Sequence, residues 1–262
     1  MPNINGNSHN PETWKIETPT AQGLHTIVTP EHSDLAALHF FRCNLNEYET
    51  IKLTNATLEM SGVVISGSLE IDYNEITTSL KQFDAFYLPA SEVAEIQAQS
   101  ATIIYLAGAP FEEVGSYHVR QFDPDLPVGN IHQIHGKPPY ERHVHMALDQ
   151  DTPASRLITG ITFGDDGAWT SWPPHQHEAN LEEIYCYFDI PKPNFALHLS
   201  YRKPGQIENI FPVSSGDCVL IPSGYHPTLA IPGAKSTYFW AMAAFSKDQR
   251  SYDLAVPDPS FG

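Results

Sequence analysis

Residues 169–191, WTSWPPHQHEANLEEIYCYFDIP, contain side chains whose types and spacing fit metal chemistry. In an extended chain, residues i and i+2 point to the same side, so His175 and His177 can direct two imidazoles to one point. Glu183 follows His177 at a distance that lets its carboxylate return on the adjoining strand. The segment therefore predicts two nitrogen ligands and one oxygen ligand close together.

Two consecutive glutamates begin the strand that is expected after residue 180. Because side chains alternate along a strand, Glu183 shares one face with Tyr185 and Tyr187. The opposite face carries Glu182, Ile184, Cys186 and Phe188. The spacing alone leaves open which glutamate joins the histidines.

A further histidine, His226, follows in the segment GDCVLIPSGYH. Gly216 makes the preceding turn, Pro222 ends the strand, and Gly224 gives the chain the freedom to turn His226 inward. Histidine nitrogens with one carboxylate suit a divalent ion such as Zn, Mn, Fe or Ni. We therefore expect one divalent metal ion on His175, His177, His226 and one of the two glutamates, Glu182 or Glu183.

A second H-x-H pair occurs in RHVHMAL, where it comprises His143 and His145. An isolated H-x-H is mostly accidental, and no carboxylate and further histidine follow this pair in the same arrangement. We interpret His143 and His145 as a coincidence without metal.

The composition predicts an all-β protein. Of its 262 residues, 22 are proline and 16 are glycine, and they divide the chain into short apolar runs rich in Val, Ile, Tyr, Phe and Thr. Such runs are typical of strands, and long helices are not expected. The length allows one large domain or two ordinary ones.

The charge balance excludes some partners. The chain has 14 Lys and Arg against 31 Asp and Glu, a formal charge of −17, so nucleic acid and anionic membranes would be repelled. Its three cysteines form no C-x-x-C pair, and its first residues lack a basic and apolar leader pattern. We therefore expect a cytoplasmic protein without a disulfide framework.

Two similar β units are expected along the chain. We predict a disordered arm over residues 1–20, a first unit over 21–110, a connector over 111–152 that is rich in proline, and a second unit over 153–262. The halves echo each other: FDAFYLP and GDCVLIP align Asp84 with Asp217 and Pro89 with Pro222. Because Val93 then stands where the second half has His226, the first unit is expected to bind no metal.

The motifs PPHQHE, LEEIYCYFDIP and VLIPSGYHP resemble the paired motifs of the cupin superfamily. Within it they are most similar to the uronate isomerases, which include 5-deoxyglucuronate isomerase of inositol breakdown and 5-keto-4-deoxyuronate isomerase of pectin breakdown. The resemblance implies a bicupin, with two jelly-roll β-barrels in one chain. It places the carboxylate ligand at Glu183, directly before Ile184 and Tyr185, with Glu182 as the alternative.

The resemblance also implies an activity. The segments RHVHMALDQDTPASRLITGITF and VLIPSGYHPTLAIPGAKSTYFWAMA are similar to the inositol branch, whereas EIYCYFDIP is similar to the pectin branch, and Gln176 stands where the inositol branch has lysine. We expect a metal-dependent aldose–ketose isomerase that converts 5-deoxy-glucuronate to 2-deoxy-5-keto-gluconate in myo-inositol catabolism. The alternatives are 5-keto-4-deoxyuronate isomerisation, or a metal-binding cupin with an oxygenase or sugar-sensing role.

Such a reaction needs a Lewis acid, proton transfer and recognition of a carboxylate. A metal ion would acidify the proton next to the sugar carbonyl, and no Gly-rich dinucleotide motif suggests a redox cofactor. Glu182 and Tyr185 are candidate catalytic groups, and Tyr238 could line the substrate site. Arg142 and Arg156 could bind the carboxylate of a small sugar acid, although surface arginines are the plainer reading. We also expect a homo-oligomer.

Overall fold

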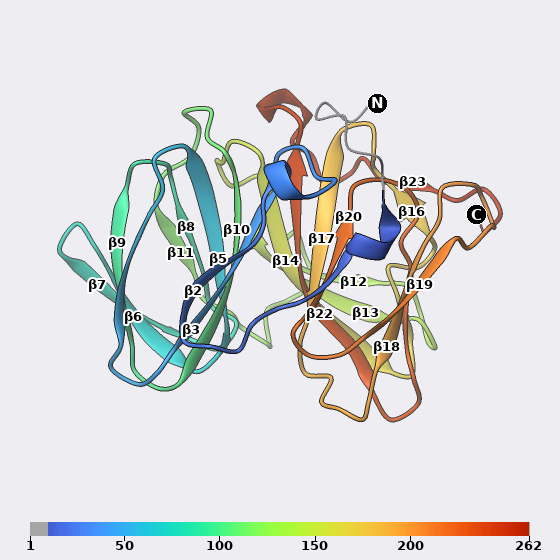
Figure 1. Ribbon diagram of the computed structural model, residues 1–262, viewed down its shortest axis with the longest axis horizontal. Coiled ribbons are helices and arrows are strands. Elements are labelled where there is room, and N and C mark those ends of the chain that lie inside the picture. The colour runs from blue at the N-terminus through green and yellow to red at the C-terminus, as the bar shows by residue number, and fades with distance from the viewer. Residues whose placement is uncertain (1–9, 262) are drawn as a thin grey trace.

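A computed structural model describes residues 10–261. Strand makes up 52% of the chain and helix 4%, which confirms the expectation of an all-β protein (Figure 1). The helices are single 3-10 turns, and none of those within residues 10–261 is long and apolar enough to cross a membrane.

The N-terminal half contains one six-stranded and one four-stranded antiparallel sheet. The larger sheet has the order β11-β8-β5-β10-β3-β2 and the smaller one the order β4-β9-β6-β7. The elements up to this point of the chain are η1 (Pro11–Thr13), β1 (Lys15–Glu17), β2 (Gly23–Val28), η2 (Pro30–His32), β3 (His39–Leu45), β4 (Thr50–Thr54), β5 (Leu58–Ser66), β6 (Ser68–Tyr73), β7 (Ile76–Lys81), β8 (Ala85–Leu88), β9 (Val93–Ala98), β10 (Thr102–Pro110) and β11 (His118–Arg120).

The C-terminal half repeats this plan with a seven-stranded sheet of order β1-β20-β17-β22-β14-β13-β12 and a four-stranded sheet of order β15-β21-β18-β19. A two-stranded sheet, β16-β23, lies apart from both. The elements are β12 (His132–His135), β13 (Arg142–Leu148), β14 (Leu157–Asp166), β15 (Trp169–Thr170), β16 (His175–Gln176), β17 (Leu181–Tyr187), β18 (Ala196–Ser200), β19 (Asn209–Val213), β20 (Asp217–Ile221), β21 (Thr228–Ala230), β22 (Lys235–Ala244), η3 (Lys247–Gln249) and β23 (Val256–Pro257).

The two large sheets pack against each other in the middle of the molecule (Figure 1). Phe40 on β3 and Tyr105 on β10 meet Phe239 on β22, with ring centroids 6.2 and 6.3 Å from Phe239. Two further apolar cores fill the space between the large and small sheet of each half. The large sheets are thus buried on both faces, which explains their nearly continuous apolar strands.

The boundaries of the halves differ from those expected along the chain. Strands β12 and β13, which lie within the predicted connector, pair with each other and extend the C-terminal sheet through β14. Prolines gave this segment the appearance of a linker, but Pro138 and Pro139 lie in the turn between the two strands. Because the true crossing lies between β11 and β12, the C-terminal half begins about twenty residues before residue 153.

The N-terminal arm is also different from the prediction where it is described. Residues 1–9 lie outside the described residues, but residues 10–20 include η1 and β1. Strand β1 pairs with β20, with Lys15 opposite Val219 and Glu17 opposite Asp217. Residues 15–17 therefore form an edge strand of the C-terminal sheet.

Equivalent turns in the two halves support the internal repeat. The Asp84 carboxylate accepts a hydrogen bond from the Lys81 N–H at 2.8 Å, and the Asp217 carboxylate accepts one from the Ser214 N–H at 2.7 Å. Ser91 and Gly224, which correspond in the alignment, both have a positive φ, of 66° and 86°. This shared local geometry is the physical basis of the weak sequence echo.

Candidate metal centre and substrate pocket

Strand β17 lies in the seven-stranded sheet between β20 and β22, and its side chains alternate as predicted. Tyr185 and Tyr187 belong to the core of the C-terminal half, whereas Ile184 and Cys186 belong to the layer between the halves. Glu183 lies on the same face as the tyrosines and lines a cavity inside the C-terminal half.

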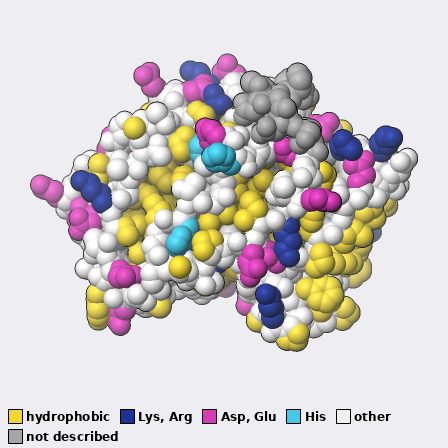
Figure 2. Space-filling model, in the orientation of Figure 1, with side chains coloured by type: hydrophobic (Ala, Val, Ile, Leu, Met, Phe, Trp, Pro, Cys, Tyr) yellow, Lys and Arg dark blue, Asp and Glu magenta, His cyan; other side chains and the backbone are white. Residues whose placement is uncertain are grey.

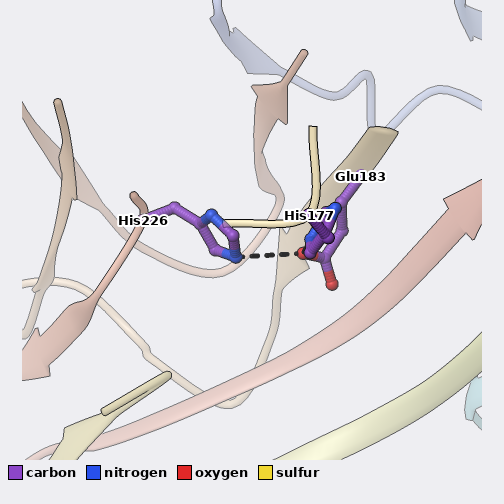
Figure 3. Close-up of side chains that lie close together, drawn as sticks. All are labelled: His177, Glu183 and His226. Atoms are coloured by element: carbon purple, nitrogen blue, oxygen red, sulfur yellow. Dashed lines mark hydrogen bonds and ion pairs between the residues drawn. The ribbon is translucent and has the colours of Figure 1, made fainter. Parts of the chain in front are cut away.

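Three of the predicted ligands converge on that face. The Nε2 atoms of His177 and His226 lie 2.9 and 3.2 Å from one oxygen of Glu183 (Figure 3). One ligand atom from each of the three residues lies within 4.8 Å of the other two, and all three side chains are buried. Elements distant in sequence thus bring a carboxylate and two imidazoles to one point.

Backbone carbonyls fix the orientation of all three predicted histidine ligands. The Nδ1 atom of His175 lies 3.0 Å from Pro173 O, that of His177 3.2 Å from Leu181 O, and that of His226 3.0 Å from Gly224 O. Because a carbonyl oxygen only accepts, Nδ1 carries a proton in each ring, and Nε2 is the nitrogen directed away from the backbone; in His177 it lies 2.9 Å from a Glu183 oxygen. This is the arrangement in which a histidine binds a metal ion.

The Nε2 atoms of His177 and His226, together with the Glu183 carboxylate, make the cluster suitable for a cation. The Nε2 atom of His226 is buried and, within residues 10–261, has no partner in hydrogen-bond geometry. An unprotonated Nε2 of His226 would repel the Glu183 oxygen that it faces at 3.2 Å, unless a positive charge lies between them. The donor set of nitrogens and one carboxylate oxygen therefore fits a divalent metal ion.

Without that ion, attraction between the Glu183 carboxylate and the neighbouring histidines stabilises the cluster. Burial by itself would raise the pKa of Glu183, but the hydrogen bond of His177 and the proximity of the His177 and His226 rings lower it to about 2. Burial would lower the pKa of His177, but the hydrogen bond and charge of Glu183 raise it above the ordinary value. The Glu183 carboxylate is therefore ionised at neutral pH, as a metal ligand must be.

His175 lies beside this group of three. Its ring centroid is 5.0 Å from that of His226 and 6.5 Å from that of His177, and it lines the same cavity. Burial and the neighbouring His226 lower the pKa of His175 to about 3, so its ring is neutral. The structure thus brings His175 to the edge of the cluster, and not into the close set of three.

The cavity extends from these residues to the β13 side of the sheet. Its volume is about 360 Å³, within the range of about 300–1,000 Å³ common for small-molecule sites. Arg142 and Tyr238 line it, as does Tyr185, whose ring stacks on Tyr238 at 4.2 Å. The Tyr185 hydroxyl lies 3.3 Å from Ser171 Oγ, and Arg142 donates to Trp172 O at 2.8 Å. Burial raises the pKa of both tyrosines, so they remain protonated donors.

Two predicted residues lie elsewhere. The Glu182 carboxylate accepts hydrogen bonds from the N–H groups of Ala36, Ala37 and Leu38 at 2.6, 2.7 and 2.7 Å. It is directed at the N-terminal half, so its assignment as a catalytic group or alternative ligand is corrected. Arg156 donates from Nε to Glu112 at 2.6 Å and does not line the cavity, so it is not placed to bind substrate.

The second H-x-H pair belongs to a separate group of histidines. His132 Nε2 lies 2.9 Å from His143 Nδ1, and the rings of His132 and His145 stack at 4.3 Å. His145 lines a different, smaller cavity that includes Phe122. In the described part of the chain, this group does not bring three ligand atoms together as the other cluster does.

The structure adds residues to the pocket that the motifs did not indicate. His135 on β12, together with Tyr252 and Asp253 near the end of the described chain, also lines the cavity. Tyr252 and Asp253 follow His226 of the last motif by 26 and 27 positions, and no spacing rule connects them with it. His198 lies buried beside the site, with its Nδ1 2.7 Å from the Tyr187 hydroxyl.

Sequence comparison with known proteins places the chain in a family. Residues 15–255 match the KduI/IolB family. The chain belongs to this family. Relatives named 5-deoxy-glucuronate isomerase occur in Geobacillus kaustophilus, 30% identical with 86% of each chain covered, and in Geobacillus thermodenitrificans, 29% identical with 86% of this chain and 87% of the relative covered.

Solved structures agree with the fold that the family implies. An IolB-like protein from Salmonella typhimurium LT2 superposes with a TM-score of 0.78 at 22% identity, covering 95% of this chain and 98% of the other. A Bacillus subtilis oxalate decarboxylase variant gives 0.64 at 14% identity, covering 96% and 80%. These neighbours support a cupin-like, nearly all-β fold, and the oxalate decarboxylase has Mn(II) centres.

Proposed function

We propose that this chain is a metal-dependent aldose–ketose isomerase that converts 5-deoxy-glucuronate to 2-deoxy-5-keto-gluconate. The observation that carries the proposal is the set of histidines whose Nδ1 atoms are fixed by backbone carbonyls, with the Nε2 atoms of His177 and His226 facing one oxygen of Glu183. The relatives named 5-deoxy-glucuronate isomerase support the same reaction.

The two halves are proposed to be two cupin barrels in one chain. The repeated Asp84 and Asp217 turns and the paired sheets of each half support this arrangement. Strand β5 begins Leu58-Glu59-Met60 where β17 begins Leu181-Glu182-Glu183, so methionine stands in place of the carboxylate ligand. With Val93 at the position of His226, the N-terminal barrel is proposed to have a structural role.

His177, Glu183 and His226, with His175 beside them, would hold one divalent ion. When bound, this ion supplies Lewis acidity at a sugar carbonyl and its neighbouring hydroxyl. The chain contributes the rigid placement of the ligands, because Glu183 lies in the middle of a seven-stranded sheet and the histidine rings are fixed through Nδ1.

Arg142 is proposed to bind the carboxylate of the sugar acid. With a net charge of −17, and with acidic side chains scattered over the surface (Figure 2), the protein offers an anion no general attraction, so binding depends on a local cation. The Arg142 guanidinium is half-buried, lines the cavity and is oriented by Trp172 O. A guanidinium in such a place suits a planar carboxylate.

The tyrosines are proposed to hold protons on the sugar oxygens. In the reaction a proton leaves the hydroxyl-bearing carbon next to the aldehyde, and a proton is added to the aldehyde carbon. Tyr185 and Tyr238 stay protonated because they are buried, so each can donate a hydrogen bond to an oxygen on which negative charge develops. Their stacking at 4.2 Å keeps both rings fixed in the pocket wall.

The experiment that tests this function is an anaerobic incubation of the metal-loaded protein with 5-deoxy-glucuronate, followed by NMR of the sugar. We expect conversion of the aldose to the ketose at the same rate with and without oxygen. A requirement for oxygen would favour an oxygenase. Faster conversion of 5-keto-4-deoxyuronate would favour the pectin reaction, and binding without conversion of either sugar would favour a sensor.

A further inference from the structure

The segment that follows η3 crosses the C-terminal half and forms one wall of the substrate cavity. Tyr252, Asp253, Ala255 and Pro257 all line it. These residues come after the last strand of the seven-stranded sheet, and β23 lies beside β16 (Figure 1). We call residues 251–258 the C-terminal strap.

Hydrogen bonds hold the strap in place at both of its ends. At its start the Tyr252 N–H donates to Gln150 Oε1 at 2.7 Å, and Gln150 Nε2 donates to the Asp253 carboxylate at 3.1 Å. At its end the Asp258 carboxylate, which is buried, accepts from the Tyr201 hydroxyl at 2.8 Å and from Gly205 N–H at 2.9 Å. A segment held at both ends in this way has a defined position over the site.

The strap also holds one of the predicted metal ligands. Strand β16, which contains His175, pairs only with β23 in the two-stranded sheet, with His175 opposite Pro257 and Gln176 opposite Val256. The Asp258 N–H donates to Pro174 O at 2.7 Å, directly before His175. Whereas Glu183 is fixed by a large sheet, the backbone at His175 is fixed by the strap.

Tyr252 lines the cavity and has a hydroxyl that is available to a ligand. Its ring packs against Trp240, with centroids 5.7 Å apart, and within residues 10–261 its hydroxyl makes no hydrogen bond. Burial, followed by the negative charge of Glu183, raises its pKa, while Arg142 has the opposite effect, so the group stays protonated. Tyr252 lines the same cavity as Glu183 of the metal cluster and Arg142 of the proposed carboxylate site, so a sugar acid bound to both would lie against it.

We propose that the C-terminal strap completes the active site, in that β23 positions His175 for the metal and Tyr252 donates a hydrogen bond to a hydroxyl of the bound sugar acid. The inference rests on the proposed function and deepens it, since it names Tyr252 as the residue that recognises the middle of the substrate. The hydroxyls concerned are those between the reacting carbons and the carboxylate. Tyr252 would thus discriminate between uronates that differ in these hydroxyls.

The first test replaces Tyr252 by phenylalanine, which keeps the ring on Trp240 and removes only the hydroxyl. We expect kcat/KM for 5-deoxy-glucuronate to fall roughly 10-fold, the value of one neutral hydrogen bond at the upper end of its range, with unchanged metal content and melting temperature. Tyr48→Phe is the matched control, because Tyr48 is 68% exposed in the N-terminal half. A 3-deoxy or 4-deoxy analogue should abolish the difference between parent and Tyr252→Phe.

An unchanged kcat/KM in Tyr252→Phe would overturn the role of this hydroxyl while leaving the proposed function intact, since the parent would still turn over. Absence of turnover in the parent would instead contradict the proposed function. A loss in Tyr252→Phe that persists for both deoxy analogues would also contradict the role, because it would show that the hydroxyl acts on something other than these substrate groups.

The second test removes residues 256–262, and with them β23, and measures Zn²⁺ affinity by competition with a chelator. We expect affinity to fall by about 10- to 100-fold, the usual effect of losing a group that orients a metal ligand. His175→Ala should cause a similar loss, and the truncation should add little to it. If the truncation lowers affinity equally with and without His175, the strap does not act through this ligand. Should the truncated chain not fold, Asp258→Asn serves as the milder variant, with the same comparison.

Discussion

Glu182 and Glu59 occupy equivalent positions in the two halves and make equivalent contacts across the interface. Glu182 accepts three backbone N–H groups from residues 36–38, and Glu59 accepts three from residues 155–157 at 2.6 to 2.8 Å. Burial raises the pKa of both carboxyl groups, while the hydrogen bonds oppose this shift. Both are therefore expected to act as clamps between the halves and to take no part in the chemistry.

Replacing Glu182 by glutamine tests this conclusion. One carboxylate oxygen becomes an NH₂ group that faces the Ala36 N–H, so one charge-assisted hydrogen bond, worth about 1.5–3 kcal/mol, is lost and the other two become weaker. The neutral glutamine does not carry the desolvation cost of the buried Glu182 carboxylate, and this difference offsets part of the loss. We expect the free energy of unfolding to fall by about 2–4 kcal/mol. At about 2–4 °C per kcal/mol for a chain of this size, the melting temperature should fall by roughly 5–15 °C.

The assay compares melting temperature, metal content and kcat in Glu182→Gln and Glu59→Gln. The second variant is a matched control, because its clamp faces the opposite way and lies outside the cavity that contains Glu183. Both should lose stability, Glu59→Gln at least as much because Glu59 also accepts from the Tyr87 hydroxyl at 2.6 Å. In both, kcat should remain within roughly twofold of the parent, since a general base would contribute about 10²–10⁴-fold. A collapse of kcat in Glu182→Gln alone, with normal stability and metal content, would refute the reasoning.

Three further predictions follow from the placement of the site residues. His226→Ala should abolish metal binding and isomerisation, because it removes a buried side chain of the proposed metal site. The control variant, His145→Ala, should keep turnover within a few fold of the parent. Equal activities of the two variants in an NMR assay would contradict the metal site. Arg142→Gln should raise KM for the uronate by about 10- to 100-fold, because a charge-assisted hydrogen bond is lost, while Arg156→Gln should leave KM unchanged. Steady-state kinetics in which Arg156→Gln raises KM and Arg142→Gln does not would place the carboxylate site at Arg156. Zn²⁺ or Mn²⁺ at about 100 times its Kd should stabilise the parent against thermal unfolding by about 2.7 kcal/mol, and should stabilise His226→Ala very little. Equal stabilisation of both proteins would show that the ion binds elsewhere.

Local patterns in the sequence predicted much of the site. The i, i+2 spacing of His175 and His177 and the alternation along β17 correctly placed Glu183 on the cavity side. Pro222 and Gly224, which follow β20, correctly indicated that the chain turns before His226, because the local geometry of a short segment depends mainly on its own glycine and proline residues. The prediction of an all-β fold succeeded for the same reason, since strand length and punctuation are local properties.

The sequence by itself therefore determined the strand-rich fold and the face of β17 that carries Glu183, both of which follow from short-range chemistry. Only the tertiary structure decided which arginine enters the cavity: Arg142 lines it, while Arg156 is paired with Glu112. It also decided that Glu182 clamps the N-terminal half, and that Tyr252 reaches the pocket from far along the chain. These outcomes depend on contacts between residues distant in sequence, whose partners are fixed by packing of whole sheets and leave no periodic pattern in the chain.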